Sequence, residues 1–167
     1  MEIRQPIHSE HAKHLDTSGL RRHFLIEEMF QQNKINLIYS HIDRIIVGAA
    51  VPLGEPLSLE GGKEIGVEFF LQRRELGVIN IGEPGLVTVD GKTFEIGARE
   101  ALYVGMGARE IVFSSVKPEH PARFYLNCAP AHHAYPTRKI SREDAAPESL
   151  GSQENCNVRT IYKYLHP

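Results

Sequence analysis

Alternating apolar and polar residues dominate the chain between residues 36 and 130, a pattern that predicts β-strands. The most specific signal is Asp90-Gly91, because a type I′ hairpin turn needs positive φ at both central residues. A turn there pairs Val89 with Lys92, Thr88 with Thr93, Val87 with Phe94 and Leu86 with Glu95. One face of the hairpin is then apolar, with Val87, Val89, Phe94 and Ile96, and the opposite face meets water.

Similar runs recur along this part of the chain, rich in β-branched and aromatic residues and separated by Gly, Pro or Asp. The runs are INLIYSH, DRIIVGAAVPL, GVEFFLQRRELGVINIG, EALYVG, REIVFSSV and PARFYLNCAP. Short strands with such regular punctuation are typical of antiparallel sandwiches and barrels. The sequence therefore predicts a mainly β fold, an antiparallel cupin-type jelly-roll barrel, over residues 31–140.

The N-terminal segment, residues 1–30, has a different pattern and is expected to form an arm. Asp16 offers an N-cap to a short helix at about residues 17–24, where Leu20 and Phe24 have amphipathic spacing. Three histidines, at positions 8, 11 and 14, would share a face of a helix, but no Glu or Cys completes a metal site with them. We expect an exposed arm.

The composition changes again after the last strand run. Residues 141–157 are polar, with Pro, Gly and Ser, and are expected to form a surface linker. Residues 158–167 alternate once more and predict a further strand, the start of a second barrel. The sequence shows no other predicted strand that would pair with this one.

Composition and charge narrow the class of protein. The chain has 167 residues, 41% of them hydrophobic and 24% charged, as in ordinary globular proteins. A formal charge of −2 gives no reason to expect nucleic acid or a membrane as a partner. No apolar run is long enough to span a bilayer or to act as a signal peptide. Cys128 and Cys156 form no metal or disulfide motif, so we expect free thiols and cytoplasmic residence.

Metal-binding cupins place two His at i and i+2 on one strand, with a Glu shortly after, so that alternation directs them into the barrel. Here Glu75 falls at the carboxylate position, and the imidazole positions hold Phe69 and Leu71, or Glu68 and Phe70. A second motif ends in another His, and that position holds Ala108. The sequence predicts a barrel with no metal ligand in this chain.

Four other side chains are candidates for substrate binding. His41 lies two residues before Asp43, so a carboxylate could orient its imidazole as a general base. Arg73 and Arg74 could offer guanidinium groups to a carboxylate ligand. His132 and His133 are weaker candidates, because neighbouring side chains of an extended segment diverge. No residue is assigned as the proton-transfer group.

Six stretches of the chain resemble one family, the 5-keto-4-deoxyuronate isomerases. They are RQPIHSEHAKHLDTSGLR, YSHIDRIIVG, RRELGVINIG, VTVDG, ALYVGMGA and FYLNCAPAHHAYPT. The resemblance runs from Arg4 to Tyr164 and is weakest in the polar linker. It implies a two-barrel cupin enzyme that interconverts the aldose and ketose forms of a sugar acid in pectin and uronate breakdown.

The resemblance also implies zinc, held by three His and one Glu, and a homohexameric assembly. Those ligands would lie in the second barrel, beyond this chain, and none of its histidines matches them. The sequence therefore predicts the N-terminal half of the isomerase. Two alternatives stay open: a metal-free module for assembly or sugar-acid binding, and an unrelated cupin enzyme that uses His41 and Arg73. If this half of the isomerase folds alone, we expect an exposed, partly apolar surface where the second barrel would pack.

Overall fold

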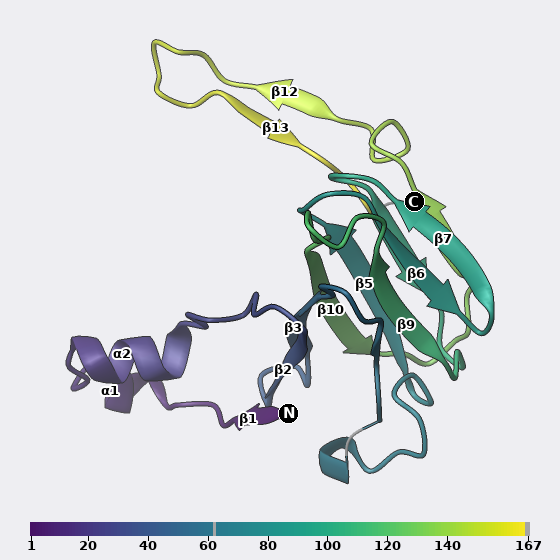
Figure 1. Cartoon of the computed structure of the whole chain (residues 1–167). Helices are drawn as coiled ribbons and strands as arrows, with labels where there is room; N and C mark the ends of the chain where they lie inside the picture. The colour runs from purple at the N-terminus through teal and green to yellow at the C-terminus, as the bar shows by residue number, and fades with distance from the viewer. Residues whose placement is uncertain (62, 166–167) are drawn as a thin grey trace.

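A computed structural model describes residues 1–61 and 63–165 of the chain. Its centre is a sandwich of two β-sheets (Figure 1). The seven-stranded sheet has the order β1 (Glu2–Arg4), β2 (Lys34–Ser40), β3 (Ile46–Val51), β10 (Phe124–Pro130), β5 (Arg74–Asn80), β8 (Ala101–Val104) and β11 (Arg138–Ile140). The four-stranded sheet has the order β4 (Leu57–Ser58), β9 (Ile111–Ser115), β6 (Gly85–Val89) and β7 (Lys92–Ile96). All neighbours are antiparallel except β1 and β2.

This arrangement confirms the predicted fold class, a mainly β antiparallel jelly roll. The Asp90-Gly91 turn also forms as predicted, with positive φ at both residues and the register from Val89–Lys92 to Leu86–Glu95. Val87 and Val89 are buried while Thr93 is exposed, so the predicted apolar face is the inner one. The two sheets share no strand among the described residues, so the sandwich does not close into one hydrogen-bonded barrel.

The hydrophobic core fills the space between the two sheets. Its largest fully buried side chains come from both sheets and from the segment before β5, and they are Ile46, Phe70, Leu71, Leu76, Ile96, Leu102, Phe113, Phe124 and Leu126. Phe113 of β9 and Phe124 of β10 meet across the sandwich, with ring centroids 5.3 Å apart. Each such side chain stabilises the fold by about 1.5–3 kcal/mol through burial.

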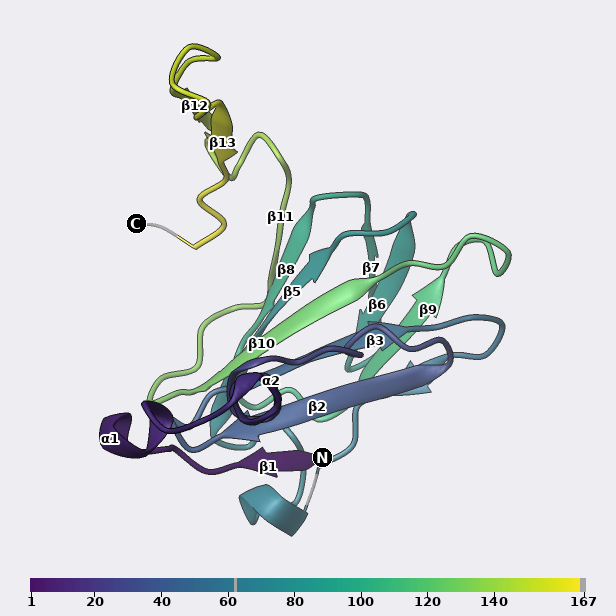
Figure 2. The same cartoon turned by 90° about the vertical axis from the view of Figure 1, so that its left-hand side faces the viewer.

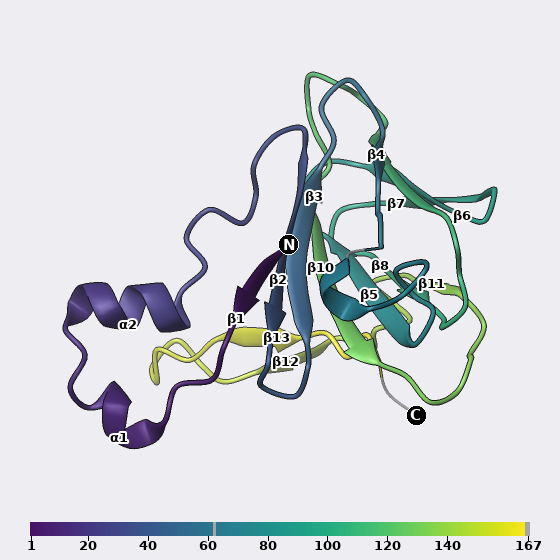
Figure 3. The same ribbon diagram turned by 90° about the horizontal axis from the view of Figure 1, so that it is seen from below.

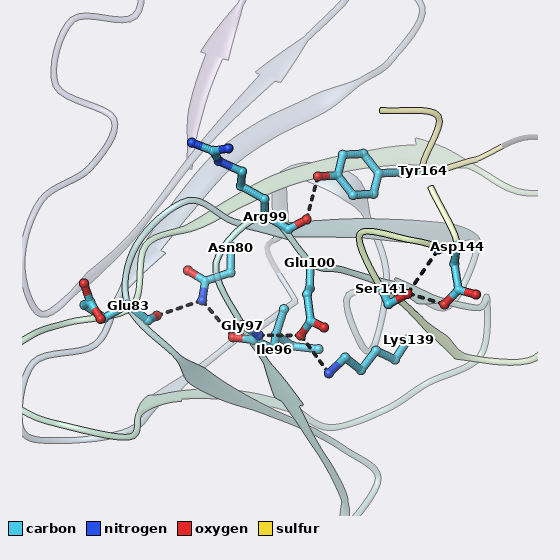
Figure 4. A network of polar contacts seen from close by, with 10 residues as sticks. All are labelled: Asn80, Glu83, Ile96, Gly97, Arg99, Glu100, Lys139, Ser141, Asp144 and Tyr164. Atoms are coloured by element: carbon cyan, nitrogen blue, oxygen red, sulfur yellow. Dashed lines mark hydrogen bonds and ion pairs between the residues drawn. The ribbon is translucent and has the colours of Figure 1, made fainter. Parts of the chain in front are cut away.

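One polar side chain, Asn80, lies at the end of β5 inside this core and is fully buried. Its amide nitrogen donates to the carbonyl oxygens of Glu83 and Ile96, each at 2.8 Å (Figure 4). Its oxygen accepts from the backbone N–H groups of Gly82 and Arg123. Asn80 therefore satisfies four backbone groups where the chain leaves the sheet.

Two arms extend from the same side of the sandwich (Figures 1 and 3). The N-terminal arm holds α1 (Ser9–Ala12) and α2 (Thr17–Phe24). Asp16 caps α2 by accepting a hydrogen bond from Gly19 N at 2.7 Å, as the sequence predicted. Leu20 and Phe24 are 43% and 57% exposed, so the helix forms without burying its apolar residues against the sandwich.

The C-terminal arm is a hairpin of β12 (Glu148–Leu150) and β13 (Arg159–Ile161), which stands clear of the sandwich (Figure 2). The strand predicted near the end of the chain thus has a partner, and that partner lies inside the segment expected to be a linker. Both expectations are corrected here, because three residue pairs suffice for a short ladder that the sequence pattern does not reveal. Whether residues 158–167 begin a second barrel stays a prediction.

Two further expectations differ from the structure. Residues 67–73 were expected to continue a strand, but they form bends and turns after η1 (Lys63–Ile65), and β5 begins only at Arg74. The predicted arm also contains β1, which pairs with β2 in parallel. Parallel pairing of residues that lie far apart leaves no local signal in the sequence.

Candidate binding site

Of the four predicted substrate-binding residues, two contact the same aromatic ring, that of Tyr39 at the end of β2. His41 is exposed and meets the edge of the Tyr39 ring, with centroids 5.0 Å apart. The Arg74 guanidinium lies over the same ring, 5.4 Å from its centroid. Tyr39 therefore connects the two side chains at the end of the sandwich.

Arg74 is only 7% exposed, and its donors are directed at the backbone. Its Nη2 donates to the carbonyl oxygen of Arg44 at 2.8 Å, and its Nη1 approaches that of Cys128 at 3.5 Å. These contacts tie the turn between β2 and β3 to β5 and β10. The neighbouring Arg73 and Asp43 have exposed side chains and make no side-chain hydrogen bond or ion pair among the described residues. Substrate contact by these four residues stays a prediction.

The positions of the cupin metal motifs hold no metal-binding cluster. Phe70, Leu71 and Ala108 lie in the hydrophobic core, and Glu75 points to the opposite face of β5. The described residues include no group of three or more His, Cys, Asp or Glu side chains that could hold a metal ion. His8 of the N-terminal arm instead caps α1, accepting from Glu10 N through Nδ1. Residues 1–61 and 63–165 therefore offer no set of side chains that fits a zinc site of three His and one Glu.

The more promising site lies on the outer face of the seven-stranded sheet. Along β5, Arg74, Leu76, Val78 and Asn80 are buried in the sandwich, so Glu75, Gly77 and Ile79 face outward. Gly77 pairs with Tyr103 of β8 on one side and with Asn127 of β10 on the other. The outward side chains of Tyr103 and Asn127 thus flank Gly77, which has no side chain.

Gly77 leaves a hollow in this face, and the backbone does not require a glycine there. Its φ is not positive, and a Cβ built on it would meet only the Asn127 carbonyl oxygen, at 3.7 Å. Gly48 in the neighbouring β3 is different, because a Cβ there would overlap the Asn36 carbonyl oxygen. A cavity of about 220 Å³ lies over Gly77, between the side chains of Tyr103, Tyr125 and Asn127.

A larger cavity of about 650 Å³ shares Tyr103 with this hollow and reaches the edge of the sheet. Its lining combines aromatic and charged side chains, namely Glu75, Tyr103, Tyr135, Arg138, Asp144 and Tyr164. Small-molecule sites are typically concave, largely apolar and supplied with a few well-placed polar groups. The two cavities together, which we call the outer-face hollow, have this character.

Glu75 and Tyr103 form the best-defined polar pair of the hollow. The Tyr103 hydroxyl donates to Glu75 Oε2 at 2.7 Å. Burial raises the pKa of Tyr103, and the hydrogen bond to the Glu75 carboxylate raises it further, so the phenol stays protonated. Among the described residues, Glu75 Oε1 makes no hydrogen bond and remains available as an acceptor.

The segment that follows β13 covers one side of the hollow. Tyr164 donates through its hydroxyl to the carbonyl oxygen of Arg99 at 2.7 Å (Figure 4). Lys163 N donates to the carbonyl oxygen of Ala145, in a turn that Ser141 and Asp144 close with reciprocal hydrogen bonds. Ala101, Ile140 and Ala145 form a small apolar cluster beneath this cover. The cover therefore has its own packing and polar anchors.

A second large cavity, of about 640 Å³, lies between α2 and β2. It contains several arginines, but two of them are paired with carboxylates of the same arm. Arg4 Nε lies 2.7 Å from Glu2 Oε1, and Arg21 Nε lies 2.6 Å from Glu27 Oε1. Arg22, which also lines this cavity, makes no side-chain hydrogen bond or ion pair among the described residues.

Sequence reasoning did not identify the hollow. Alternation in RRELGVIN shows that Glu75 and Gly77 share a face, which is the only local signal. Tyr103 and Asn127 are 26 and 50 residues further along, and the sheet order alone places them beside Gly77. A glycine in the middle of a regular strand was the clue that could have been followed.

The sandwich, its apolar interior and its connections define a cupin-type jelly-roll protein. The solved structure of an IolB-like protein from Salmonella typhimurium LT2 superposes with a TM-score of 0.55 and 16% identity, covering 72% of this chain and 44% of that one. Ylba from E. coli superposes with a TM-score of 0.50 and 12% identity, covering 75% and 50%. At such identities these likenesses show the fold alone.

Sequence comparison identifies the family. The KduI/IolB family matches residues 24–167, so the chain belongs to it. The 4-deoxy-L-threo-5-hexosulose-uronate ketol-isomerases of Edwardsiella ictaluri and Enterobacter sp. are 57% and 56% identical to the whole chain. The chain spans 61% of the length of these curated relatives.

Two further sequence expectations can be compared with the structure. Both cysteines are free thiols, Cys128 buried and Cys156 exposed, as expected. Across the part of the chain that the structure describes, neither helix is long and apolar enough to cross a membrane.

Proposed function

We propose that this chain is the N-terminal part of a ketol-isomerase that interconverts 4-deoxy-L-threo-5-hexosulose uronate and its isomer. The observation that carries the proposal is 57% identity over the whole chain to a relative named for that activity. An aldose–ketose interconversion moves a proton between neighbouring carbons, which requires an acid–base side chain and a group that polarises the carbonyl. Pectin and uronate breakdown in the cytoplasm is the setting that we propose for the reaction.

In this proposal the chain contributes a folded β-sandwich and a binding surface. Its described residues do not fit a zinc site, so we assign zinc binding to residues outside this chain and derive no step through the metal. A homohexamer is part of the proposal too. Large apolar side chains exposed on the arms, such as Phe24 and Val158 at 57% and 68%, offer surface for self-association.

The test compares this chain with the same sequence extended to the length of its relatives. We expect the extended protein to isomerise the hexosulose uronate and to bind zinc stoichiometrically, while the 167-residue chain does neither. An extended protein that binds zinc and is folded, yet leaves the substrate unchanged, would contradict the proposed function. Activity of the shorter chain would move the reaction into the part described above.

A second candidate function is sugar-acid binding without catalysis. The outer-face hollow favours it, because that cavity combines aromatic walls with an arginine and two carboxylates. Binding of a sugar acid by the 167-residue chain in the absence of turnover would support this function.

A further inference from the structure

We propose that a phosphate group binds between the guanidinium groups of Arg99 and Arg142, beside the Tyr162 hydroxyl, and ties the segment that follows β13 to the sandwich. These three residues come from the turn between β7 and β8, the turn after β11 and the segment after β13. None of them lines the outer-face hollow, so the site is separate from it. The inference depends neither on the isomerisation nor on sugar-acid binding.

The three segments meet at the hydroxyl of Tyr162. Arg142 Nη2 donates to this hydroxyl at 3.5 Å, and the Arg99 guanidinium is hydrogen-bonded to it from the other turn. The hydrogen bond from Arg142 lowers the pKa of Tyr162, partial burial opposes the shift, and Arg99 lowers the pKa again. The surroundings of this oxygen therefore favour negative charge.

The backbone of each residue is held in place without a ligand. Arg99 has a φ of 63°, its N–H donates to the Asn80 carbonyl oxygen at 2.7 Å, and its own carbonyl accepts from Tyr164 (Figure 4). The ring of Tyr162 stacks on that of Tyr164, with centroids 6.0 Å apart. Arg142 lies in the hydrogen-bonded turn described above. A ligand would thus meet a partly organised site.

The charges at this end of the molecule leave these two arginines poorly compensated. Other cations nearby interact with a carboxylate of their own, and the pairs are Lys139 with Glu100, Lys163 with Glu148, and Arg138 with Asp144. Among the described residues, Arg99 has no carboxylate partner, and Arg142 has the electrostatic attraction of the neighbouring Glu143. Two like charges therefore converge on a neutral phenol, and an anion between them would relieve their repulsion.

The donors suit a phosphate better than a carboxylate. Each guanidinium presents a planar fork of N–H groups, and the phenol adds an O–H group. A phosphate ester has three acceptor oxygens and a charge of about −1.5 to −2 at pH 7, so it can bond both forks and the hydroxyl together. A carboxylate has two oxygens and a single charge, which one arginine already matches.

The test is a titration of the 167-residue chain with inorganic phosphate at constant ionic strength, followed by NMR shifts of amide and arginine Nε–Hε groups. We expect shifts at Arg99, Arg142 and Tyr162, and at least about tenfold weaker binding of acetate. Arg142→Gln and Arg99→Gly should each weaken phosphate binding about tenfold, since each removes charge-assisted hydrogen bonds. Arg99→Gly also suits the positive φ, so this variant should remain folded.

Hydrogen exchange measures whether the phosphate ties the segment down. The N–H of Lys163 donates to the Ala145 carbonyl oxygen at 2.7 Å. At a phosphate concentration about ten times the dissociation constant, its exchange should slow about tenfold, because a ligand protects the closed state by mass action. At the same concentration, Arg142→Gln should show about a twofold slowing. Unchanged exchange with phosphate bound would contradict the proposed tie.

Arg159→Gln is the matched control, because it removes an arginine of β13 that bonds to Asn157. It should bind phosphate as the unchanged chain does, and thermal unfolding shows whether each variant is folded. Tighter binding of glycerol 1-phosphate than of inorganic phosphate would identify an ester as the source of the group, and the reverse would identify free phosphate.

Three results would overturn the proposal. They are equal binding of acetate and phosphate, full binding by folded Arg142→Gln and Arg99→Gly variants, and the absence of any shift at millimolar phosphate. Turnover is not measured, so failure here leaves the isomerase proposal untouched.

Discussion

The two faces of the seven-stranded sheet differ although they are built from the same strands. On the inner face, Leu76 and Val78 of β5 pack against the second sheet and are almost fully buried. On the outer face, Glu75 and Gly77 alternate with them and border an open hollow. A single strand therefore contributes to the hydrophobic core on one side and borders an open cavity on the other, which is what a period of two residues permits.

We expect the largest difference in the free energy of unfolding between variants of two neighbouring residues of β10. Leu126 is 1% exposed and faces inward, whereas Asn127 is exposed and faces outward. Leu126→Ala should lower the free energy of unfolding by about 2–5 kcal/mol, because it leaves a cavity in the core. Asn127→Ala should change it by about 0.5 kcal/mol or less. Urea titrations measure both values, and similar losses would mean that the faces are not distinct.

The buried side-chain amide of Asn80 allows the same stability measurement on a polar residue of the core. Asn80→Ala should lower the free energy of unfolding by about 2–3 kcal/mol, since it leaves buried backbone groups unsatisfied. The loss should appear as a lower urea midpoint with an unchanged slope. A variant as stable as the unchanged chain would show that water can replace the amide and that this end of the core is open.

Two glycines of the same sheet should respond differently to alanine. Gly48→Ala should lower the free energy of unfolding by about 1–3 kcal/mol, because the new methyl group overlaps the Asn36 carbonyl oxygen. Gly77→Ala should be neutral or stabilising by up to about 1 kcal/mol, since it adds a side chain in open space. Thermal unfolding of the pair checks this, and a destabilised Gly77→Ala variant would show a steric need for that glycine.

The smallest expected effect is the pH dependence of stability that arises from Glu100, directly before β8. Although partial burial opposes ionisation, the hydrogen bond and ion pair with Lys139 and the hydrogen bond from Gly97 N lower the pKa of Glu100. A lowered pKa stabilises the fold above the unfolded-state value of about 4.3, and this contribution is lost as the pH falls through the folded-state value. Glu100→Gln should therefore cost under about 1 kcal/mol at pH 7 and nothing at low pH. A difference in stability that persists at pH 2 would contradict the assignment.

Local features of the fold were predictable from the sequence, and long-range ones were not. The Asp90-Gly91 hairpin and the helix capped by Asp16 are confirmed because turn and cap residues act on their immediate neighbours. The pairing of β12 with β13 and of β1 with β2 was missed, because it depends on segments that meet only in the folded chain.

The same limit applies to the candidate site. The sequence favours two local pairs of polar residues, His41 with Asp43 and Arg73 with Arg74, and in the structure Arg74 binds backbone carbonyls instead. The outer-face hollow instead joins β5, β8 and β10, whose adjacency is a property of the sheet order. Sequence pattern can assign a residue to a face, but it does not reveal which strands lie next to each other.

Thiol reactivity measures the difference between the two faces most directly, because Cys128 and Asn127 are neighbours in β10 with opposite orientations. In a Cys156→Ser background, the labelling rate of Cys128 would be compared with that of a thiol introduced by Asn127→Cys, with Cys128→Ser in the second variant. Burial raises the pKa of Cys128 to about 11. A rise of about two units lowers its thiolate fraction on the order of 100-fold, and burial slows access further. We expect the thiol at position 127 to react at least 100-fold faster at pH 8, and equal rates would contradict a closed inner face and an open outer one.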